Sequence, residues 1–133
     1  MNYYVLDTNI VSAILKRQVP VMRELQNISL TDHMLIGCPV VWYETRRGLQ
    51  AKRANKQLER LQDLFGRFDW QDYTRDDWTL AATWWARLRT NGVQIADADL
   101  LIAVFTHRRN ATLVTDNTKD FSQLDVTTVN WLV

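Results

Sequence analysis

The chain has 133 residues, of which 47% are hydrophobic and 23% are charged, and its net charge is +1. This size fits one globular domain, residues 1–133, and leaves no room for a second domain of ordinary size. The near-neutral charge excludes a bulk polycation, so any nucleic-acid binding must come from local patches. The single cysteine, Cys38, excludes an internal disulfide, and no apolar stretch is long enough to span a bilayer. We therefore expect a cytoplasmic protein with no membrane partner.

Short apolar runs alternate with amphipathic stretches along the chain. In chain order, the pattern predicts strand 2–6, helix 8–16, helix 21–26, strand 34–38, helix 39–53, helix 55–65, strand 68–73, helix 77–89, helix 97–107, strand 112–115 and strand 126–129. Helices that alternate with short buried strands predict an α/β fold with a mostly parallel central sheet.

The predicted helix 77–89 is rich in tryptophan. Asp76 or Asp77 is expected to cap it. Its apolar stripe is formed by Trp78, Ala81, Ala82, Trp85 and Leu88. Trp84 falls off this stripe, so we expect it to be exposed and to be a candidate contact for a partner. Trp42 is a second candidate, although we favour ordinary core packing for it.

Acidic residues stand at the ends of the short apolar runs. Asp7 follows the first predicted strand, Asp116 follows the strand 112–115, and Asp99 opens an apolar helix. Because the carboxyl ends of parallel strands share one edge of a sheet, these carboxylates are expected to meet there. Carboxylates in one crevice repel one another unless a cation joins them. Oxygen ligands of this kind suit Mg²⁺ or Mn²⁺.

Each acid also has an ordinary structural explanation. Asp7 suits a helix cap as well as a ligand, although Thr8 and Asn9 could cap the helix instead. Glu44 lies near the buried side of its helix and could pair with Arg47 or Arg46.

The remaining acids have alternatives too. A helix needs one cap, so we assign capping to Asp97 and the functional role to Asp99. Asp116 and Asn117 form a common turn pair. Asp120 is expected to cap or to pair at the surface.

Four segments, taken in order, resemble the motifs of PIN-domain nucleases. They read LDTN at 6–9, VVWYE at 40–44, IADADLLIA at 95–103 and ATLVTDNTKDF at 111–121. Their order and spacing most resemble the VapC toxins of bacterial toxin–antitoxin pairs, and they cover essentially the whole chain. The resemblance implies a three-layer α/β/α sandwich and an endoribonuclease that depends on Mg²⁺ or Mn²⁺. It also implies an RNA substrate, a VapB-like antitoxin and a homodimer.

The resemblance also implies roles for individual residues. Asp7 and Asp99 would bind the ion directly, while Glu44 and Asp116 would bind it directly or through water. Many PIN domains carry the fourth acid at the position of Asn117, so either Asp116 or Asn117 fills that place. The residues expected to orient these carboxylates are Thr8, Asn9, Asp97, Thr115 and Asn117.

A basic run follows Glu44 and contains Arg46, Arg47, Lys52 and Arg53. Such runs are usually solvated helix faces. Because this one adjoins a candidate ligand, contact with RNA phosphates is the alternative interpretation.

Other functions fit the same residues. A PIN-like nuclease for RNA processing, outside any toxin–antitoxin pair, would look the same in sequence. A non-catalytic interaction module would use the acids only as helix caps. An aspartyl-phosphate enzyme built on Asp7 is disfavoured, since such enzymes typically need a second Asp two residues later and Asn9 stands there.

Overall fold

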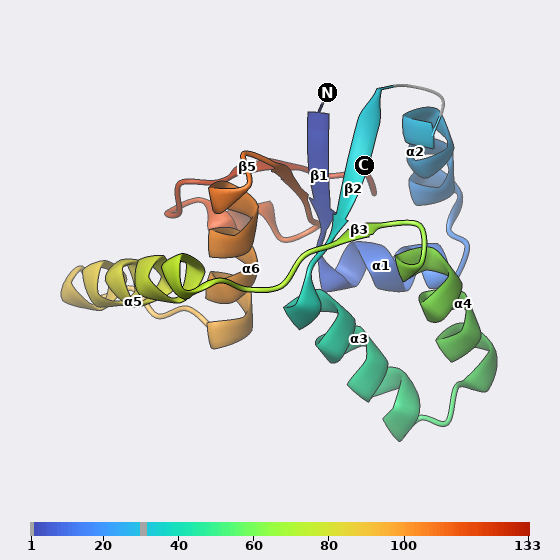
Figure 1. Cartoon of the computed structure of the whole chain (residues 1–133), viewed down its shortest axis with the longest axis horizontal. Helices are drawn as coiled ribbons and strands as arrows, with labels where there is room; N and C mark the ends of the chain where they lie inside the picture. Colours follow the sequence, from blue (N-terminus) through green and yellow to red (C-terminus); the bar gives the residue numbers. More distant parts are fainter. Residues whose placement is uncertain (1, 30–31) are drawn as a thin grey trace.

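The computed structural model describes residues 2–29 and 32–133 (Figure 1). The strands are β1 (Asn2–Leu6), β2 (His33–Gly37), β3 (Asp69–Trp70), β4 (Thr112–Val114) and β5 (Thr127–Val129). The helices are α1 (Thr8–Leu15), α2 (Val19–Ser29), α3 (Pro39–Ala51), α4 (Asn55–Phe65), α5 (Arg75–Thr90), α6 (Asp97–Arg108) and the short 3₁₀ helix η1 (Thr118–Phe121). The sequence predicted these strands and α-helices with shifts at their ends, but it did not predict η1, and the expected strand 68–73 is reduced to the two residues of β3.

The five strands form one parallel sheet in the order β3-β2-β1-β4-β5. β1 is central, with Tyr4 paired to Leu35 of β2 and Leu6 paired to Val114 of β4. Figure 1 shows α1, α2 and α4 on one side of the sheet and α5 and α6 on the other. The predicted α/β/α sandwich is confirmed. Its parallel strands bring the chain segments after β1, β2 and β4 to one edge.

Helices α1 and α3 both start at this edge, and their first residues agree in part with the sequence prediction. Asp7 is the N-cap of α1, and its side chain accepts a hydrogen bond from the Thr8 amide. Thr8 and Asn9 were alternative caps, but both already lie inside the helix. Pro39 occupies the first turn of α3, where its missing amide hydrogen costs nothing.

The start of α5 differs from the prediction. Thr74 is the N-cap, and Asp77 is the third helical residue of a reciprocal capping box. Neither Asp76 nor Asp77 is therefore the cap. A threonine hydroxyl and an acid three residues later satisfy two free amides at once, which a single Asp cap does not do.

The exposed face of α5 also differs from the prediction. Trp84 is buried at 4% exposure, whereas Trp78 and Trp85 are 52% and 42% exposed. The buried stripe is Asp77, Ala81, Trp84 and Leu88, with regular helical spacing. Hydrophobicity alone could not identify this stripe, because one of its members is a carboxylate. The expectation that Trp84 is exposed was wrong.

Helix α6 crosses the core and is buried along most of its length. Its buried residues are Leu100, Ile102, Ala103, Val104, Phe105 and Thr106. Its N-cap is Ala96, and Asp97 is an exposed first helical residue, so the expected capping role of Asp97 was wrong. A negative charge in this first turn still interacts favourably with the helix dipole. Within the described residues, no helix is long and apolar enough to cross a bilayer.

Candidate active site

Asp7 lies at the centre of the edge where β1 ends. Its side chain is buried, and its residue is 4% exposed. Oδ1 accepts the Thr8 amide at 2.7 Å, and Oδ2 accepts the Thr115 hydroxyl at 2.8 Å. Burial raises the pKa of Asp7, these hydrogen bonds oppose the rise, and the charge of Glu44 adds to it. Asp7 is thus both a helix cap and a carboxylate that faces another acid.

Glu44 is carried by α3 and reaches back to the start of α1. Its Oε1 accepts the Thr8 hydroxyl at 2.9 Å. Its Oε2 lies 3.8 Å from Nη2 of Arg47, whose side chain is 58% exposed. The salt bridge that the sequence offered as an alternative is present, but it is long and open to solvent, so it leaves most of the Glu44 charge uncompensated.

Asp99 projects from the first turn of α6 toward the same edge. Its pKa is raised to about 6, first by burial and then by the charges of Asp7, Glu44 and Asp120. Carboxylates that are 37 or more residues apart in the sequence therefore act on one another electrostatically. Asp7 and Glu44 thus lie near enough to Asp99 for their charges to act on it.

Asp120 is a member of this group that sequence reasoning missed. It belongs to η1 and raises the pKa of Asp99. With Asp99, Lys119 and Gln123 it lines a cavity of about 380 Å³. The available signal was the position of Asp120 in the fourth motif, which we instead assigned to the strand-adjacent Asp116.

Asp116 has a more peripheral environment. It is exposed, and its Oδ1 accepts a hydrogen bond from Nδ2 of Asn130 at 2.9 Å. Its backbone amide donates to Oδ1 of Asn9 at 3.1 Å. The neighbouring Asn117 donates its amide to the Thr115 hydroxyl at 3.0 Å. These contacts hold the loop after β4 against the start of α1.

The residues expected to orient the carboxylates divide into two groups. Thr8, Asn9 and Thr115 are joined to Asp7 or Glu44 by hydrogen bonds, including a 3.4 Å bond from Asn9 to Oδ2 of Asp7. Asn117 acts one step away, because its amide donates to the Thr115 hydroxyl. Asp97 lies elsewhere, beside a cavity lined by Trp78 and Trp85. The first group can hold Asp7 in one orientation, whereas Asp97 makes no contact of this kind with the described part of the chain.

The donor set fits a hard divalent cation in its chemistry. Oxygen atoms of Asp7, Glu44 and Asp99 lie in this region, and burial, followed by the charges of neighbouring acids, raises the pKa of Asp7 and of Asp99. Among residues 2–29 and 32–133, no three Asp, Glu, His or Cys side chains are close enough to form a ready ligand cluster. Mg²⁺ does not require such a cluster, since it usually keeps several waters and takes one or two carboxylates directly.

The basic residues near Glu44 are not equivalent. The Arg46 guanidinium lies over Trp42, with 5.1 Å from Cζ to the ring centroid, and the Arg47 guanidinium lies over Tyr43 at 4.9 Å. Lys52 and Arg53 are exposed just beyond the end of α3. Arg46 and Arg47 therefore adjoin the acidic group through their helix, while Lys52 and Arg53 are one to two turns farther away.

A model of the PIN domain matches residues 4–126 of this chain. The chain belongs to the PIN domain family. Ribonuclease VapC2 of Rickettsia felis is 30% identical over 135 residues, covering 96% of this chain and 97% of that protein. The crystal structure of VapBC2 from Rickettsia felis, bound to a DNA fragment from their promoter, matches with a TM-score of 0.88 at 25% identity, over 97% and 98% of the two chains. The FitAcB structure from Neisseria gonorrhoeae matches with a TM-score of 0.74 at 26% identity, over 97% and 98%.

The resemblance to VapC-type PIN proteins is thereby confirmed. The PIN fold explains why the acids meet: each stands where a parallel strand or the following helix reaches the same edge.

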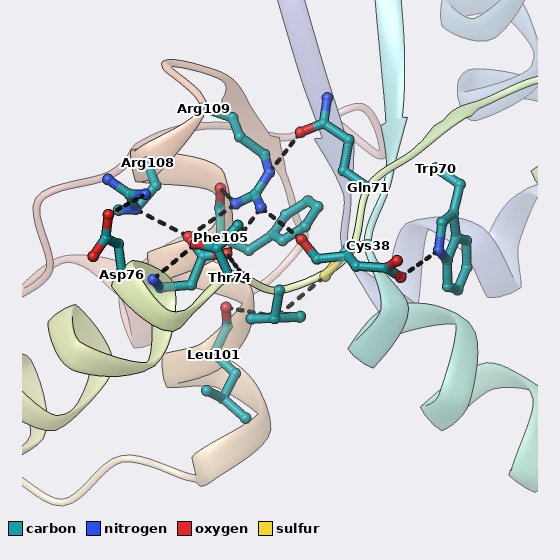
Figure 2. Close-up of polar contacts among 12 residues, drawn as sticks. Cys38, Trp70, Gln71, Thr74, Asp76, Leu101, Phe105, Arg108 and Arg109 are labelled. Carbon is teal, nitrogen blue, oxygen red and sulfur yellow. Dashed lines mark hydrogen bonds and ion pairs between the residues drawn. The ribbon is translucent and has the colours of Figure 1, made fainter.

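The PIN fold contains a second buried acid, which sequence reasoning did not connect to its partners. Arg109 donates to Asp77 Oδ2 at 2.9 Å and to the Phe105 carbonyl at 2.9 Å, and Arg108 donates to Asp77 Oδ1 at 3.0 Å. Figure 2 shows Arg109 between Gln71 and Phe105, with Arg108 beside Asp76. Basic residues at the end of a helix ordinarily complement its C-terminal carbonyls, and only the bond from Arg109 to the Phe105 carbonyl is of this kind. The larger role of Arg108 and Arg109 is to tie α5 to α6.

Proposed function

We propose that this chain is a Mg²⁺- or Mn²⁺-dependent endoribonuclease and the toxin of a VapBC-type pair. The observation that carries the proposal is that Thr8 binds the carboxylates of both Asp7 and Glu44 at the carboxyl edge of the sheet, and that the charges of both act on Asp99. The similarity to Ribonuclease VapC2 supports RNA as the substrate. The similarity to VapBC2 supports a VapB-like antitoxin as the partner. Action on cellular RNA implies a cytoplasmic location.

In this proposal, Asp7 and Asp99 are the direct ligands of the ion. Glu44 and Asp116 bind directly or through water, and Asp120 is a further candidate because it acts on Asp99. The chemistry that a divalent ion supplies when bound is activation of water and neutralisation of charge on the phosphate.

The side chains around Asp7 have a positioning role. Thr115 and the Thr8 amide fix the two oxygens of Asp7, so its free lone pairs point in a constant direction. Thr8 also holds one oxygen of Glu44, which couples the two carboxylates through a single residue. Arg46, Arg47, Lys52 and Arg53 are proposed to bind the phosphates on either side of the cleaved bond.

The test is cleavage of total cellular RNA by the purified chain in Mg²⁺ or Mn²⁺, with and without EDTA. Asp99→Asn and Asp7→Asn should each reduce the rate by at least about a hundred-fold, because an ion ligand is lost. Asp63→Asn, an exposed acid on α4, is the matched control and should cleave like the wild type. Undiminished cleavage in EDTA or in Asp99→Asn would refute metal-dependent catalysis by this group.

The toxin role needs a separate experiment. Expression of the chain alone should arrest growth, and Asp99→Asn should abolish the arrest. Co-expression of a small antitoxin encoded beside it should restore growth and yield a stable complex. Growth arrest that survives Asp99→Asn would contradict the toxin proposal. RNA cleavage without arrest would instead favour an RNA-processing nuclease.

The oligomeric state is also proposed from the resemblance. We expect a homodimer, measurable by light scattering of the purified chain. The exposed Trp78 and Trp85 on α5 are candidates for this contact, in place of the buried Trp84.

A further inference from the structure

One face of α3 carries an exposed aromatic ring next to the acidic group. Tyr43, Glu44, Arg47 and Gly48 are adjacent on this face, because residues four apart in a helix lie one above the other. Tyr43 is 56% exposed, so more than half of its surface contributes no burial energy to the fold. The ring therefore has surface to offer to a partner.

This ring is connected to Asp7 by a continuous series of contacts. The Arg47 guanidinium lies 4.9 Å from the centroid of Tyr43 and 3.8 Å from the carboxylate of Glu44. Glu44 in turn accepts the Thr8 hydroxyl at 2.9 Å, and the Thr8 amide binds Asp7 at 2.7 Å. A molecule lying on Tyr43 would extend directly to the carboxylates.

Gly48 adds an independent observation about the same face. A methyl group on Gly48 would meet no heavy atom within 4 Å beyond its own helix and chain neighbours. Glycine inside a helix is about 0.5–1 kcal/mol less favourable than alanine, so it lowers stability here without a packing reason in this chain. Close approach of another molecule to the helix backbone would explain it.

We propose that this face binds an unpaired stretch of RNA, with one base stacked on the Tyr43–Arg47 pair and the adjoining backbone against Gly48. The inference rests on the proposed nuclease function and names the residues that would hold the RNA beside the carboxylates. A base must expose its flat face to stack on an aromatic ring or a guanidinium plane, and in a duplex both faces are covered. Arg47 would then pair with the phosphate that leads to the carboxylates. Loops and single strands are thus preferred over duplex RNA.

The test measures RNA binding in EDTA, where cleavage does not interfere. The probes are a fluorescent, unstructured oligoribonucleotide pool and the same pool converted to duplex. Tyr43→Leu should weaken single-strand binding about ten-fold, the effect of losing one base–aromatic stack, and leave duplex binding unchanged. Tyr43→Trp should bind like the wild type. Tyr3→Leu is the matched control, because Tyr3 is exposed at the opposite end of β1.

Two further measurements separate stacking from structural damage. In Mg²⁺, Tyr43→Leu should raise KM for single-stranded RNA about ten-fold and leave kcat nearly unchanged. Gly48→Ala should raise the melting temperature of the free protein and weaken single-strand binding. A destabilised variant would not show this combination.

The possible failures are distinguishable. If the wild type cleaves RNA but Tyr43→Leu binds and cleaves single strands equally well, this inference is overturned and the nuclease proposal stands. If Tyr43 controls single-strand binding but the wild type never cleaves, the nuclease proposal fails and the binding surface stands. If Tyr43→Leu converts a dimer to a monomer and weakens both RNAs equally, the face belongs to a second copy of the chain and the inference is overturned.

Discussion

Two aspartates in the first turns of helices, Asp77 and Asp99, have pKa values that are shifted in opposite directions. Asp77 lies in the first turn of α5 with its side chain fully inaccessible, yet its pKa is lowered. Burial acts to raise that pKa, but hydrogen bonds from Arg109, the Thr74 amide and Arg108 outweigh it. Asp99 lies in the first turn of α6, and its pKa is raised to about 6. The same residue type at the same helical position thus has its pKa shifted in opposite directions, and the more deeply buried Asp77 has the lowered pKa because arginines contact it.

The difference indicates which acids serve the fold and which do not. The negative charge of Asp77 is compensated within the chain by ion pairs with Arg108 and Arg109. At the other centre, neither Asp7 nor Asp99 forms an ion pair with a basic side chain of the described residues, and further acids surround them. Selection for stability alone would not assemble acids in this way, because repulsion between their negative charges destabilises the folded state. The second arrangement is one that an external cation would stabilise.

The largest expected effect comes from removing the charge of Asp77, which with Arg108 and Arg109 forms what we call the compensated centre. Asp77→Asn should lower the free energy of unfolding by about 3–5 kcal/mol, because it leaves the charge of Arg109, whose side chain is 11% exposed, without its counterion. Urea denaturation measures the change. Asp76→Asn is the matched control, since its 3.8 Å contact to Arg108 is exposed and should be worth less than about 1 kcal/mol. Equal effects of the two substitutions would contradict the contrast.

The second prediction has the opposite sign. Asp99→Asn should raise the free energy of unfolding of the EDTA-treated protein by about 1 kcal/mol at about pH 8. The reason is that the substitution removes a charge that Asp7, Glu44 and Asp120 disfavour. Asp97 remains to supply negative charge to the first turn of α6. Destabilisation by Asp99→Asn would show that the charge of Asp99 is already compensated within the fold.

The third prediction is the pH dependence that follows from the same pKa. The folded-state pKa of Asp99, about 6, lies above its ordinary value of 3.8, so the folded state binds the proton more tightly. Stability contributed by this proton is therefore present at low pH and is lost as the pH rises from about 4 through about 6. Over this pH range, the free energy of unfolding of the wild type should fall by about 1 kcal/mol relative to that of Asp99→Asn. Urea denaturation in EDTA measures both. Added Mn²⁺ should reduce this fall, and an unchanged slope in Mn²⁺ would argue against ion binding at Asp99.

Asp77 should show the reverse slope in this experiment. Its folded-state pKa is lowered, so its contribution to stability is present above its ordinary value of 3.8 and is lost as the pH falls further. The two centres therefore titrate in neighbouring pH ranges with opposite signs. The Asp77→Asn and Asp99→Asn variants separate their contributions.

The sequence predicted those features of the acidic site that follow from the positions of residues within predicted strands and helices. Asp7 directly follows β1, Glu44 lies in the helix after β2, and Asp99 lies in the first turn of α6, the helix that leads into β4. Their convergence follows from a parallel sheet with helices that start at its carboxyl edge. Asp120 was missed because the turn after Asn117 and the short η1 helix decide where it points, and neither has a clear periodic signal. The sequence therefore favoured Asp116, which directly follows the strand but bonds to Asn130.

The compensated centre was hidden for a different reason. Hydrophobic periodicity treats every carboxylate as exposed, so Asp77 could not be recognised as part of the buried stripe of α5. Its partners Arg108 and Arg109 lie more than thirty residues away in sequence, and no local rule connects them. The same error exchanged the positions of Trp84 and Trp85, since including Asp77 rotates the stripe toward Trp84.

The smallest expected effect compares the arginines of the two centres. Arg47→Met should change the free energy of unfolding by less than about 0.5 kcal/mol, because its 3.8 Å contact to Glu44 is long and 58% of its side chain is exposed. Arg109→Met should cost about 3–5 kcal/mol, because it strands the buried Asp77 and leaves the Phe105 carbonyl without its donor. Urea denaturation of both variants tests this directly. If Arg47→Met were as costly as Arg109→Met, Arg47 would be the built-in counterion of the acidic group, and the need for an external cation would disappear.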